Sequence, residues 1–362
     1  MKYYSLNKID RKNCVYNVIY GERSNGKTYA LLKRAVQNFV KDGSQMAYVR
    51  RWKEDLKVSR CKQLFAGLEE NGEIEKLTKG EFTNVHFANG KWYLCNYDEQ
   101  GKPIYSDLDV IAHKFAISDG EHDKSTQFPK VTTIVFDEFL TSRMYLNDEF
   151  VLFMNVVSTI VRRREDVKIY MLGNTVSKFS PYFQEMGLNN ALKMKQGTID
   201  VYHYGTSNLK VAVEYCANAE QKGKQTSEKY FAFNNPKLEM ITGGAWEMAI
   251  YPHKPVKFTS KDVVKDFFIM FGDETYHGEI VKIKTDLFIY IHLKTTPIKN
   301  PDTDLIYSLE HNYKRNYNRN ILKPVNKLHR LIFELFKTDK VFYQNNEVGD
   351  AINNYVKICR GL

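Results

Sequence analysis

The sequence predicts an α/β protein with a mostly parallel sheet, followed by a second, smaller α+β unit. In the N-terminal half, short apolar runs typical of buried strands alternate with amphipathic helical patterns. A polar, turn-rich stretch interrupts this alternation at residues 216–244. Beyond it, three strand patterns follow one another directly, and helical patterns come last. The change of pattern indicates two separate folding units joined by a connecting region.

The elements of the first unit follow from hydrophobic periodicity. Buried strands are expected at residues 14–21, 45–51, 131–140 and 167–174. Amphipathic helices are expected at residues 27–43 and 147–166. Asn89-Gly90, flanked by alternating apolar residues, predicts a β-hairpin. Because strands alternate with helices, we expect a mostly parallel sheet with both faces covered.

The second unit is expected to begin with strands in KDFFIMFGD, HGEIVKIK and DLFIYIHLK. Helices are expected in NKLHRLIFELFKTDK and GDAINNYVKIC. Three strands followed by helices is how an RNase H-like fold begins. The domain boundaries that we predict are 1–207 for the first domain, 208–253 for a linker or small lid, and 254–362 for the C-terminal domain.

Composition limits the classes of function. The chain has 362 residues, of which 43% are hydrophobic, enough for a sizeable core and unlike disordered or collagenous sequences. The formal net charge of +10 suits either a polyanionic partner such as nucleic acid or a merely soluble basic enzyme. The five cysteines are scattered without CxxC spacing, which argues against a disulfide framework or a cysteine zinc site. No signal peptide or membrane-spanning stretch is evident, so a cytosolic protein is expected.

The loop after the first strand carries the clearest motif. Residues 21–28 read GERSNGKT and match G-x-x-x-x-G-K-[ST]. The glycines let backbone N–H groups face phosphate oxygens, and the following helix offers its positive end. A plain glycine turn would not explain Lys27 and Thr28, so we expect ATP with Lys27 on its β- and γ-phosphates and Thr28 on Mg²⁺. The residues expected to bind the nucleotide are Gly21, Arg23, Ser24, Asn25, Gly26, Lys27 and Thr28, and the role of Arg23 stays open.

Two carboxylates lie at the C-terminal end of the strand within TIVFDEF. Asp137 is expected to hold Mg²⁺ and its hydration shell, and Glu138 to act as general base on the attacking water. A carboxylate pair at a strand end is common, and the phosphate loop makes the functional interpretation the better one. The adjacent glutamate favours hydrolysis over transfer to a substrate hydroxyl. The fold class is therefore refined to a P-loop NTPase of the additional-strand, catalytic-glutamate type.

Further polar residues lie where neighbours could complete the site. Arg162, Arg163 and Arg164 follow an apolar helix and suit either helix-end charge placement or an arginine finger in a neighbouring subunit. Asn174 lies at the end of the next strand. It could be a sensor that hydrogen-bonds the water or the γ-phosphate, or simply a turn residue. Arg50, Arg51 and Lys53 could be a surface cluster or a contact to a neighbour's nucleotide.

Several segments together resemble a known family. GERSNGKTY, AYVRRWKEDL, TTIVFDEF, VRRREDV and LGNTVSKFSPYF occur in this order. They resemble the double-stranded DNA packaging ATPases of small podophages with protein-primed genomes, the phi-29-type motors. The resemblance weakens towards the C-terminus, where HNYKRNYNR resembles a polar-aromatic run of that family. It implies an ATPase domain, a small linker domain and a vestigial RNase H-like domain without nuclease activity.

The resemblance also implies an assembly and residue roles. The assembly is a homopentameric ring on the portal vertex of an empty prohead in the host cytoplasm, with double-stranded DNA as substrate and a structural RNA as a further candidate partner. By carry-over, Lys27 and Thr28 correspond to Walker A, Asp137 and Glu138 to Walker B, and Asn174 to the sensor. The arginine acting in trans falls on Arg162, and Arg50 and Lys53 fall in a segment resembling one that faces the neighbouring subunit's nucleotide.

The expected function is thus an ATP-driven motor that moves double-stranded DNA into a viral capsid. The alternatives are another nucleic-acid ATPase, such as a helicase or a filamentous-phage assembly ATPase, and a binding module with a relic loop. The basic run at residues 312–330, interleaved with tyrosines, suits phosphate-backbone contact, a solvated helix face or a protein-docking surface equally well.

Overall fold

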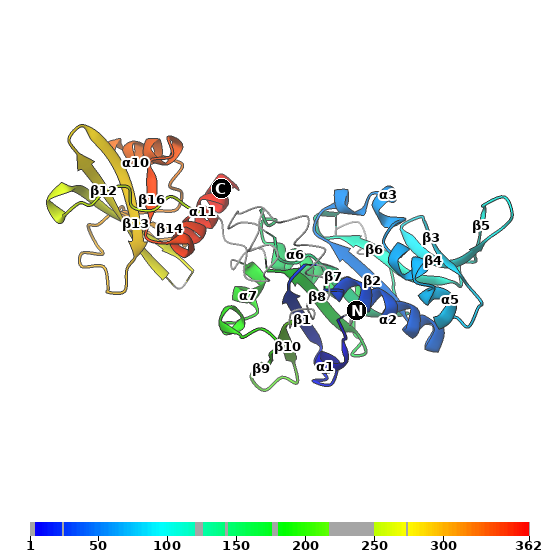
Figure 1. Cartoon of the computed structure of the whole chain (residues 1–362). Helices are drawn as coiled ribbons and strands as arrows, with labels where there is room; N and C mark the ends of the chain where they lie inside the picture. The colour runs from blue at the N-terminus through cyan, green and yellow to red at the C-terminus, as the bar shows by residue number, and fades with distance from the viewer. Residues whose placement is uncertain are drawn as a thin grey trace. The chain divides into compact units, whose positions relative to one another are not determined.

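The structure is a computed structural model. It describes residues 4–23, 25–119, 126–141, 144–175, 180–216, 250–272 and 274–361. The chain divides into two compact units, with the division between Trp246 and Glu247 (Figure 1). Within the described residues, no helix combines the length and the apolar character needed to cross a membrane.

The first unit is built on one large sheet. Its strands are β1 Tyr16–Gly21, β2 Gln45–Arg50, β3 Asn84–Ala88, β4 Lys91–Tyr97, β5 Pro103–Ile104, β6 Val110–Ala116, β7 Val131–Asp137, β8 Lys168–Asn174, β9 Ile199–His203 and β10 Lys210–Tyr215. They are arranged in the order β3-β4-β6-β2-β7-β8-β1-β10-β9, with β5 paired to β4. The central run from β6 to β10 is parallel throughout, and antiparallel strands close both edges. The predicted mostly parallel sheet is confirmed.

The strand order defines the class of this sheet. β8 pairs with β1 on one side and with β7 on the other, and both pairings are parallel. The strand that precedes the glycine loop and the strand that ends in Asp137 are therefore separated by one inserted strand. This inserted strand is the defining feature of additional-strand ATPases, so the refined fold class is confirmed.

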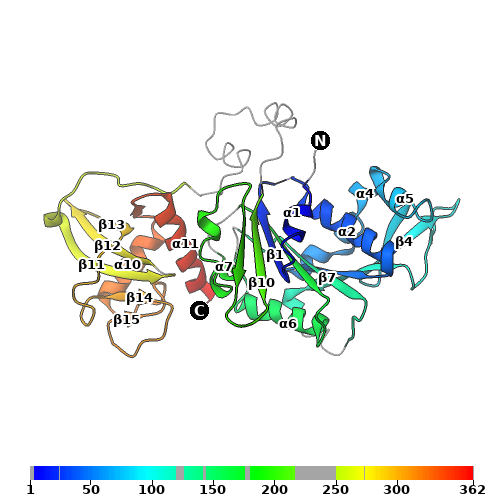
Figure 2. The same cartoon turned by 90° about the horizontal axis from the view of Figure 1, so that it is seen from below.

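Helices cover both faces of the sheet. They are α1 Asn7–Asp10, α2 Lys27–Asp42, α3 Val58–Cys61, α4 Ala66–Glu70, α5 Glu73–Leu77, α6 Glu149–Val161 and α7 Pro181–Glu185, with 3₁₀ helices η1 Lys53–Leu56, η2 Ile117–Asp119 and η3 Ala191–Lys193. Leu31 and Leu32 of α2 belong to one buried cluster, whereas Phe153 and Val156 of α6 belong to the other. α2 and α6 thus lie on opposite faces of the sheet (Figure 2). This layering is what a parallel sheet needs to bury both its faces.

Local predictions in this unit can be compared with the structure. Asn89 and Gly90 both have positive φ and join β3 to β4 in the predicted hairpin. The predicted first domain stops at residue 207, but residues 210–215 form β10, which lies in the sheet between β1 and β9 and pairs in parallel with β1. The sheet therefore includes residues that we had placed in the linker, because their backbone hydrogen bonds are made to β1 and β9. Most of the predicted linker, residues 217–249, lies outside the described residues.

The second unit has its own sheet. Its strands are β11 Val263–Phe271, β12 Glu274–Ile283, β13 Asp286–Leu293, β14 Ile306–Ser308, β15 Tyr317–Asn318 and β16 Val341–Tyr343, in the order β15-β14-β11-β12-β13-β16. Its helices are η5 Ser260–Asp262, α10 Lys327–Lys337 and α11 Asn346–Gly361. β11, β12 and β13 pair antiparallel, and β14 joins β11 in parallel, followed by β15.

This strand arrangement agrees with the predicted RNase H-like domain. Three antiparallel strands come first, β14 and β15 then extend the sheet in parallel from β11, and β16 adds in parallel to β13 at the other edge. α11 packs against β11 and β13, while α10 packs against β13. Phe267 of β11 is fully buried, and its ring occupies the space above Gly278 of the paired strand, where an added Cβ would approach it to 2.3 Å. The apolar core of this unit therefore lies between the sheet and its helices.

Candidate active site

The glycine loop lies between β1 and α2, as predicted. Gly26 precedes α2 with a left-handed φ of 90°, a conformation that glycine adopts without a Cβ clash. Gly21 is tightly packed, since a Cβ there would lie 2.9 Å from the Cβ of Cys216. Both glycines are thus needed to shape the turn that brings the loop back to the N-terminus of α2.

Lys27 is the central cation of the loop. It is only 6% exposed. Its Nζ donates to the carbonyl oxygen of Glu22 at 2.7 Å and lies 3.3 Å from the side-chain oxygen of Asn174. Burial lowers the pKa of Lys27 below its usual value, while the neighbouring acidic groups act in the opposite sense. A phosphate group would supply the negative charge that this buried ammonium favours.

The other loop residues have different surroundings. Asn25 is buried, and its side-chain oxygen accepts from the backbone N–H of Lys27 at 3.3 Å, so it supports the loop from within. Arg23 is exposed. Ser24, which we expected to bind nucleotide, lies outside the described residues.

Asp137 ends β7 beside the start of α2. The hydroxyl of Thr28 lies 3.2 Å from Oδ2 of Asp137, and the phenol of Tyr48 donates to the same oxygen at 2.8 Å. Burial raises the pKa of Tyr48 well above its usual value, and Asp137 adds to the shift, so the phenol stays a donor. A hydroxyl and a carboxylate together form the hard oxygen donor set that suits Mg²⁺. The residues present therefore fit the metal that the loop motif implies.

Glu138 follows directly and has an unusual backbone. Its φ is +60°, a left-handed conformation that costs a non-glycine residue about 1 kcal/mol and is typical of functional sites. Its side chain is 55% exposed, and Oε2 accepts from Nη2 of Arg50 at 2.6 Å. Arg50, which we expected to face a neighbour's nucleotide, is thus paired in this chain with the predicted general base.

Arg51 is a buried supporting residue, although the sequence indicated only a surface cluster with Arg50 and Lys53 or a contact to a neighbour's nucleotide. It is 5% exposed and pairs with Glu149 of α6 at 2.7 Å. Its guanidinium also donates to the carbonyl oxygens of Glu138 at 3.1 Å and Phe139 at 2.7 Å. Arg51 therefore holds the backbone at the end of β7. Side chains that are adjacent along an extended chain point to opposite sides, so the sequence can predict that Arg51 and Arg50 face different surroundings. No local sequence pattern, however, identifies Glu149 as the partner of Arg51.

Asn174 completes the group at the carboxyl ends of the strands. It ends β8, between β1 and β7, and bonds to Lys27 as described. A cavity of about 230 Å³ lies at this edge of the sheet, lined by Asn25, Gly26, Lys27, Thr28, Tyr29, Asp137, Glu138, Leu172, Gly173 and Asn174. Residues 25–28 of the predicted loop, both strand-end carboxylates and the predicted sensor residue therefore line one cavity.

Some predicted site residues do not line this cavity. Over the described residues, its lining does not include Gly21, Arg23, Arg50, Lys53 or Arg162. Lys53 pairs with Asp119 at 2.7 Å and lines a second cavity of about 320 Å³. α6 ends at Val161, earlier than predicted, because Arg162 turns the chain with a φ of +48°.

Arg162 nevertheless lies near Lys53. Its Nη2 donates to the carbonyl oxygen of Thr126 at 2.9 Å, and Thr126 lines the same second cavity as Lys53. By contrast, Arg164 donates to the carbonyl oxygens of Pro129, Phe128 and Val131 and so has a structural role beside β7. Two exposed cations, Lys53 in the lining of this second cavity and Arg162 bonded to its residue Thr126, are together called the cationic surface below.

Comparison with known proteins supports the resemblance inferred from the motifs. A family model described as Podovirus DNA encapsidation protein (Gp16) matches residues 1–204. The DNA packaging protein of Bacillus phage B103 is 31% identical over 177 residues, which make up 48% of this chain and 48% of that protein. The DNA packaging protein of Bacillus phage phi29 is 30% identical over 185 residues, 50% of this chain and 49% of that protein. The matched region thus spans about half the length of these curated relatives.

Two solved structures extend the likeness in fold to nearly the whole chain. The Phi-28 gp11 DNA packaging motor aligns with a TM-score of 0.53 at 18% identity, covering 99% of this chain and 98% of that one. The bacteriophage Phi-29 viral genome packaging motor assembly aligns with a TM-score of 0.54 at 20% identity, covering 97% of this chain and 96% of that one. Because the family match covers more than half of the sequence and contains the whole cavity described above, this chain belongs to the Podovirus DNA encapsidation protein (Gp16) family.

Proposed function

We propose that this chain hydrolyses ATP as one subunit of a ring motor that drives double-stranded DNA into a preformed viral capsid. One observation carries the proposal. A buried lysine, a hydroxyl–carboxylate pair, a second carboxylate and an amide meet at one cavity on the carboxyl edge of adjacent parallel strands. This is where open α/β sheets bind ligands. The curated relatives, which are DNA packaging proteins, support the substrate class.

Each residue has a proposed role in hydrolysis. Lys27 and the loop N–H groups bind the phosphates. Thr28 and Asp137 hold Mg²⁺, which supplies charge neutralisation on the β- and γ-phosphates when bound. Glu138 accepts the proton of the attacking water as general base, and Asn174 orients the water or the γ-phosphate. Tyr48 and Arg51 are positioning residues, because they act through Asp137 and through the backbone of Glu138.

The cationic surface of Lys53 and Arg162 is proposed to face the nucleotide of a neighbouring subunit. A cation supplied in trans stabilises charge that builds on the γ-phosphate. Arg162 is exposed and has the strained backbone that functional residues often show. Arg50, 2.6 Å from Glu138, is placed to exchange this intramolecular partner for the neighbour's nucleotide. Both proposals make the subunit interface part of the catalytic site.

The proposed partners are double-stranded DNA, further copies of this chain in a pentameric ring, and the portal of the prohead, with a structural RNA as a candidate link. The net charge of +10 supports a polyanionic partner. Since a motor must move along any sequence, its DNA contacts should be to the backbone and strongly salt-dependent. The place of action is the portal vertex in the host cytoplasm. The proposed domains are an ATPase domain that includes β10, a linker within the rest of residues 208–253, and a C-terminal domain without nuclease activity.

The variant Glu138→Gln tests the proposed chemistry. It keeps the shape of the side chain but removes the base, so ATP should bind with nearly unchanged affinity while turnover falls about 10²- to 10⁴-fold. ATP affinity, DNA-stimulated ATPase and DNA packaging would be measured on the assembled motor. The matched control is Glu99→Gln, which changes an exposed carboxylate in a turn and should leave all three unchanged. DNA packaging by Glu138→Gln at the wild-type rate would refute the role of Glu138 as general base. Separation of DNA strands by the wild-type protein would indicate a helicase instead.

A further inference from the structure

A group of metal-ligand side chains lies in the C-terminal unit, away from the nucleotide cavity. It consists of His277 and Glu279 on β12 and His292 on β13, and is called the His–Glu–His cluster below. Residues 277 and 279 are two apart on one strand and so face the same side of the sheet. His292 is the direct cross-strand partner of His277. The antiparallel register therefore brings all three side chains together on one face of the sheet.

The distances within the cluster are close to those of a metal site. One ligand atom from each of the three residues lies within 4.8 Å of the other two. Nε2 of His292 is 3.8 Å from Oε2 of Glu279. A tetrahedral zinc ion with bonds of about 2.0–2.1 Å places its ligand atoms about 3.4 Å apart. Small side-chain rotations would therefore be enough to close the cluster around an ion.

Both imidazoles have the outer partners that metal-binding histidines usually have. Nε2 of His277 lies 2.8 Å from a carboxylate oxygen of Asp266, and Nδ1 of His292 lies 3.1 Å from the carbonyl oxygen of Leu293. A proton donated to each of these oxygens leaves the other ring nitrogen with the lone pair that a metal requires. Hydrogen bonds of this kind fix the tautomer and the ring orientation of metal ligands.

The surroundings allow an ion to enter and still hold the ligands in place. The side chains of His277, Glu279 and His292 are 19%, 20% and 29% exposed. The ring of Phe268 stacks on His277 with 4.9 Å between centroids. The hydrogen bond with Asp266 and this stacking would explain the position of His277 alone. They do not explain why Glu279 and His292 converge on the same point.

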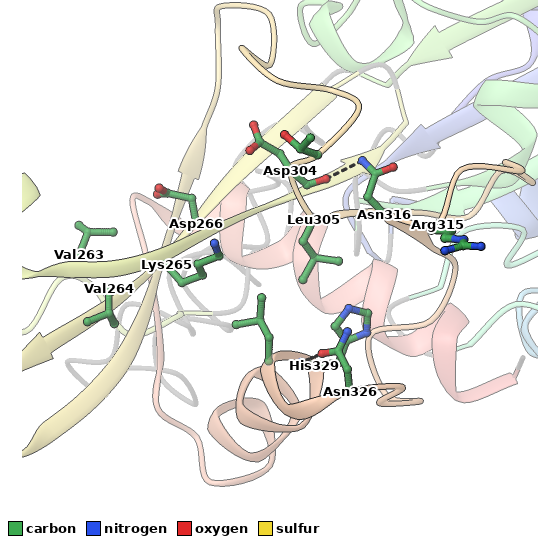
Figure 3. A pocket seen from close by; sticks show the side chains of 12 residues that line it. Val263, Val264, Lys265, Asp266, Asp304, Leu305, Arg315, Asn316, Asn326 and His329 are labelled. Atoms are coloured by element: carbon green, nitrogen blue, oxygen red, sulfur yellow. Dashed lines mark hydrogen bonds between the residues drawn. The ribbon is translucent and has the colours of Figure 1, made fainter.

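Asp266 also borders a cavity, which gives the cluster a polar neighbour. This cavity of about 510 Å³ is lined by Val263, Val264, Lys265, Asp266, Thr303, Asp304, Leu305, Arg315, Asn316, Asn326, Leu328 and His329. Figure 3 shows Asp266 on the β11 strand with Asp304 close by, while Asn326 and His329 come from the opposite side, at the start of α10. The carboxylate that orients His277 is therefore itself accessible from this cavity.

We propose that the His–Glu–His cluster binds a zinc ion. Two imidazoles and one carboxylate suit zinc, with water in the fourth position. The ion would join β12 to β13 and so stabilise the first three strands of the C-terminal unit. Cysteine spacing could not indicate this site, because its ligands are histidines and a glutamate on two strands.

Zinc binding is tested on the full-length chain without an affinity tag. After removal of metal with EDTA, the chain is titrated with Zn²⁺, and bound metal is counted by elemental analysis. We expect one zinc per chain, lost or weakened at least about 10-fold in Glu279→Gln and in His292→Gln. Asp266→Asn should weaken binding about 10- to 100-fold, because it removes only an orienting partner. The matched control is His311→Gln, which changes an exposed histidine of the same unit and should bind like the wild type.

Two further measurements separate the ion from loss of fold. In EDTA, the wild type and the variants should have similar melting temperatures. Added zinc should raise the melting temperature only in chains with an intact His–Glu–His cluster. Co²⁺ in place of zinc should give the strong visible absorption of a four- or five-coordinate site. The proposal is overturned if the wild type binds no zinc at micromolar free metal. It is equally overturned if Glu279→Gln and His292→Gln bind zinc as tightly as His311→Gln does.

Discussion

At the scale of single residues, the candidate cavity combines side chains from one short motif with supporting side chains from a distant strand. Lys27 and Thr28 are neighbours in a motif whose spacing has a direct chemical reason, so one short stretch is sufficient to identify them. Tyr48 and Arg51 act on the end of β7 from the end of β2. Their contacts arise because β2 pairs with β7, which is far away in the sequence. No rule of residue spacing within a motif predicts such contacts.

Tyr48→Phe is predicted to weaken the metal site without disturbing the fold. The ring would keep its edge-on contact with Trp92, but Asp137 would lose the phenol that donates to Oδ2 at 2.8 Å. Loss of such an orienting hydrogen bond typically costs about 10- to 100-fold in metal affinity. The Mg²⁺ concentration for half-maximal ATPase activity should therefore rise by about 10-fold or more. The control is Tyr16→Phe, whose buried phenol faces the sulfur of Met154 instead. Equal Mg²⁺ dependence of both variants would show that Tyr48 does not position Asp137.

At the scale of helices and strands, hydrophobic periodicity predicted the elements and their alternation. The order of the strands within each sheet is known only from the strand pairing in the structure. The inserted strand β8 was expected as a strand, and its position between β1 and β7 makes the sheet an additional-strand ATPase sheet. β10 was missed as part of this sheet because its polar, turn-rich surroundings resemble a linker, although its residues are buried beside β1. Likewise, His277 and His292 meet only because β12 and β13 pair in this register.

The buried Arg51–Glu149 pair is predicted to be a major link between α6 and the end of β7. Glu149 also accepts from the phenol of Tyr182 at 2.8 Å, and its side chain is fully buried. Glu149→Ala leaves a buried arginine without its carboxylate, which should lower the free energy of unfolding by about 3–5 kcal/mol. Urea denaturation would measure the change.

The matched control is an ion pair whose arginine is exposed to solvent. Arg60→Ala breaks an ion pair with Asp55 in which Arg60 is 63% exposed, so the free energy of unfolding should change by only about 0–1 kcal/mol. If Glu149→Ala were no more destabilising than Arg60→Ala, the buried pair would not have the structural role assigned to it.

At the scale of the whole molecule, the nucleotide cavity contains only part of the proposed catalytic machinery. Residues 25–28 of the loop, the strand-end carboxylates and Asn174 line it. Lys53 lines a different cavity in the described part of the chain, and Arg162 donates to Thr126, which lines that second cavity. A ring of identical subunits resolves this separation, because in a closed cyclic arrangement each subunit presents one surface to its neighbour's site. The sequence indicated an arginine finger as one of two interpretations of Arg162, Arg163 and Arg164. Only the family resemblance selected Arg162, since one chain cannot reveal which of its arginines meets another chain.

The most direct test of the account mixes two inactive variants in one ring. Glu138→Gln subunits lack the base but keep Arg162, and Arg162→Ala subunits lack the arginine but keep Glu138. In randomly mixed rings at equal amounts, roughly a quarter of the interfaces would combine both intact residues. DNA-stimulated ATPase activity should therefore recover partly on mixing, while Glu138→Gln mixed with Arg163→Ala, an exposed neighbour, serves as the reference. A mixture no more active than the separate variants would contradict the claim that a second subunit completes the site.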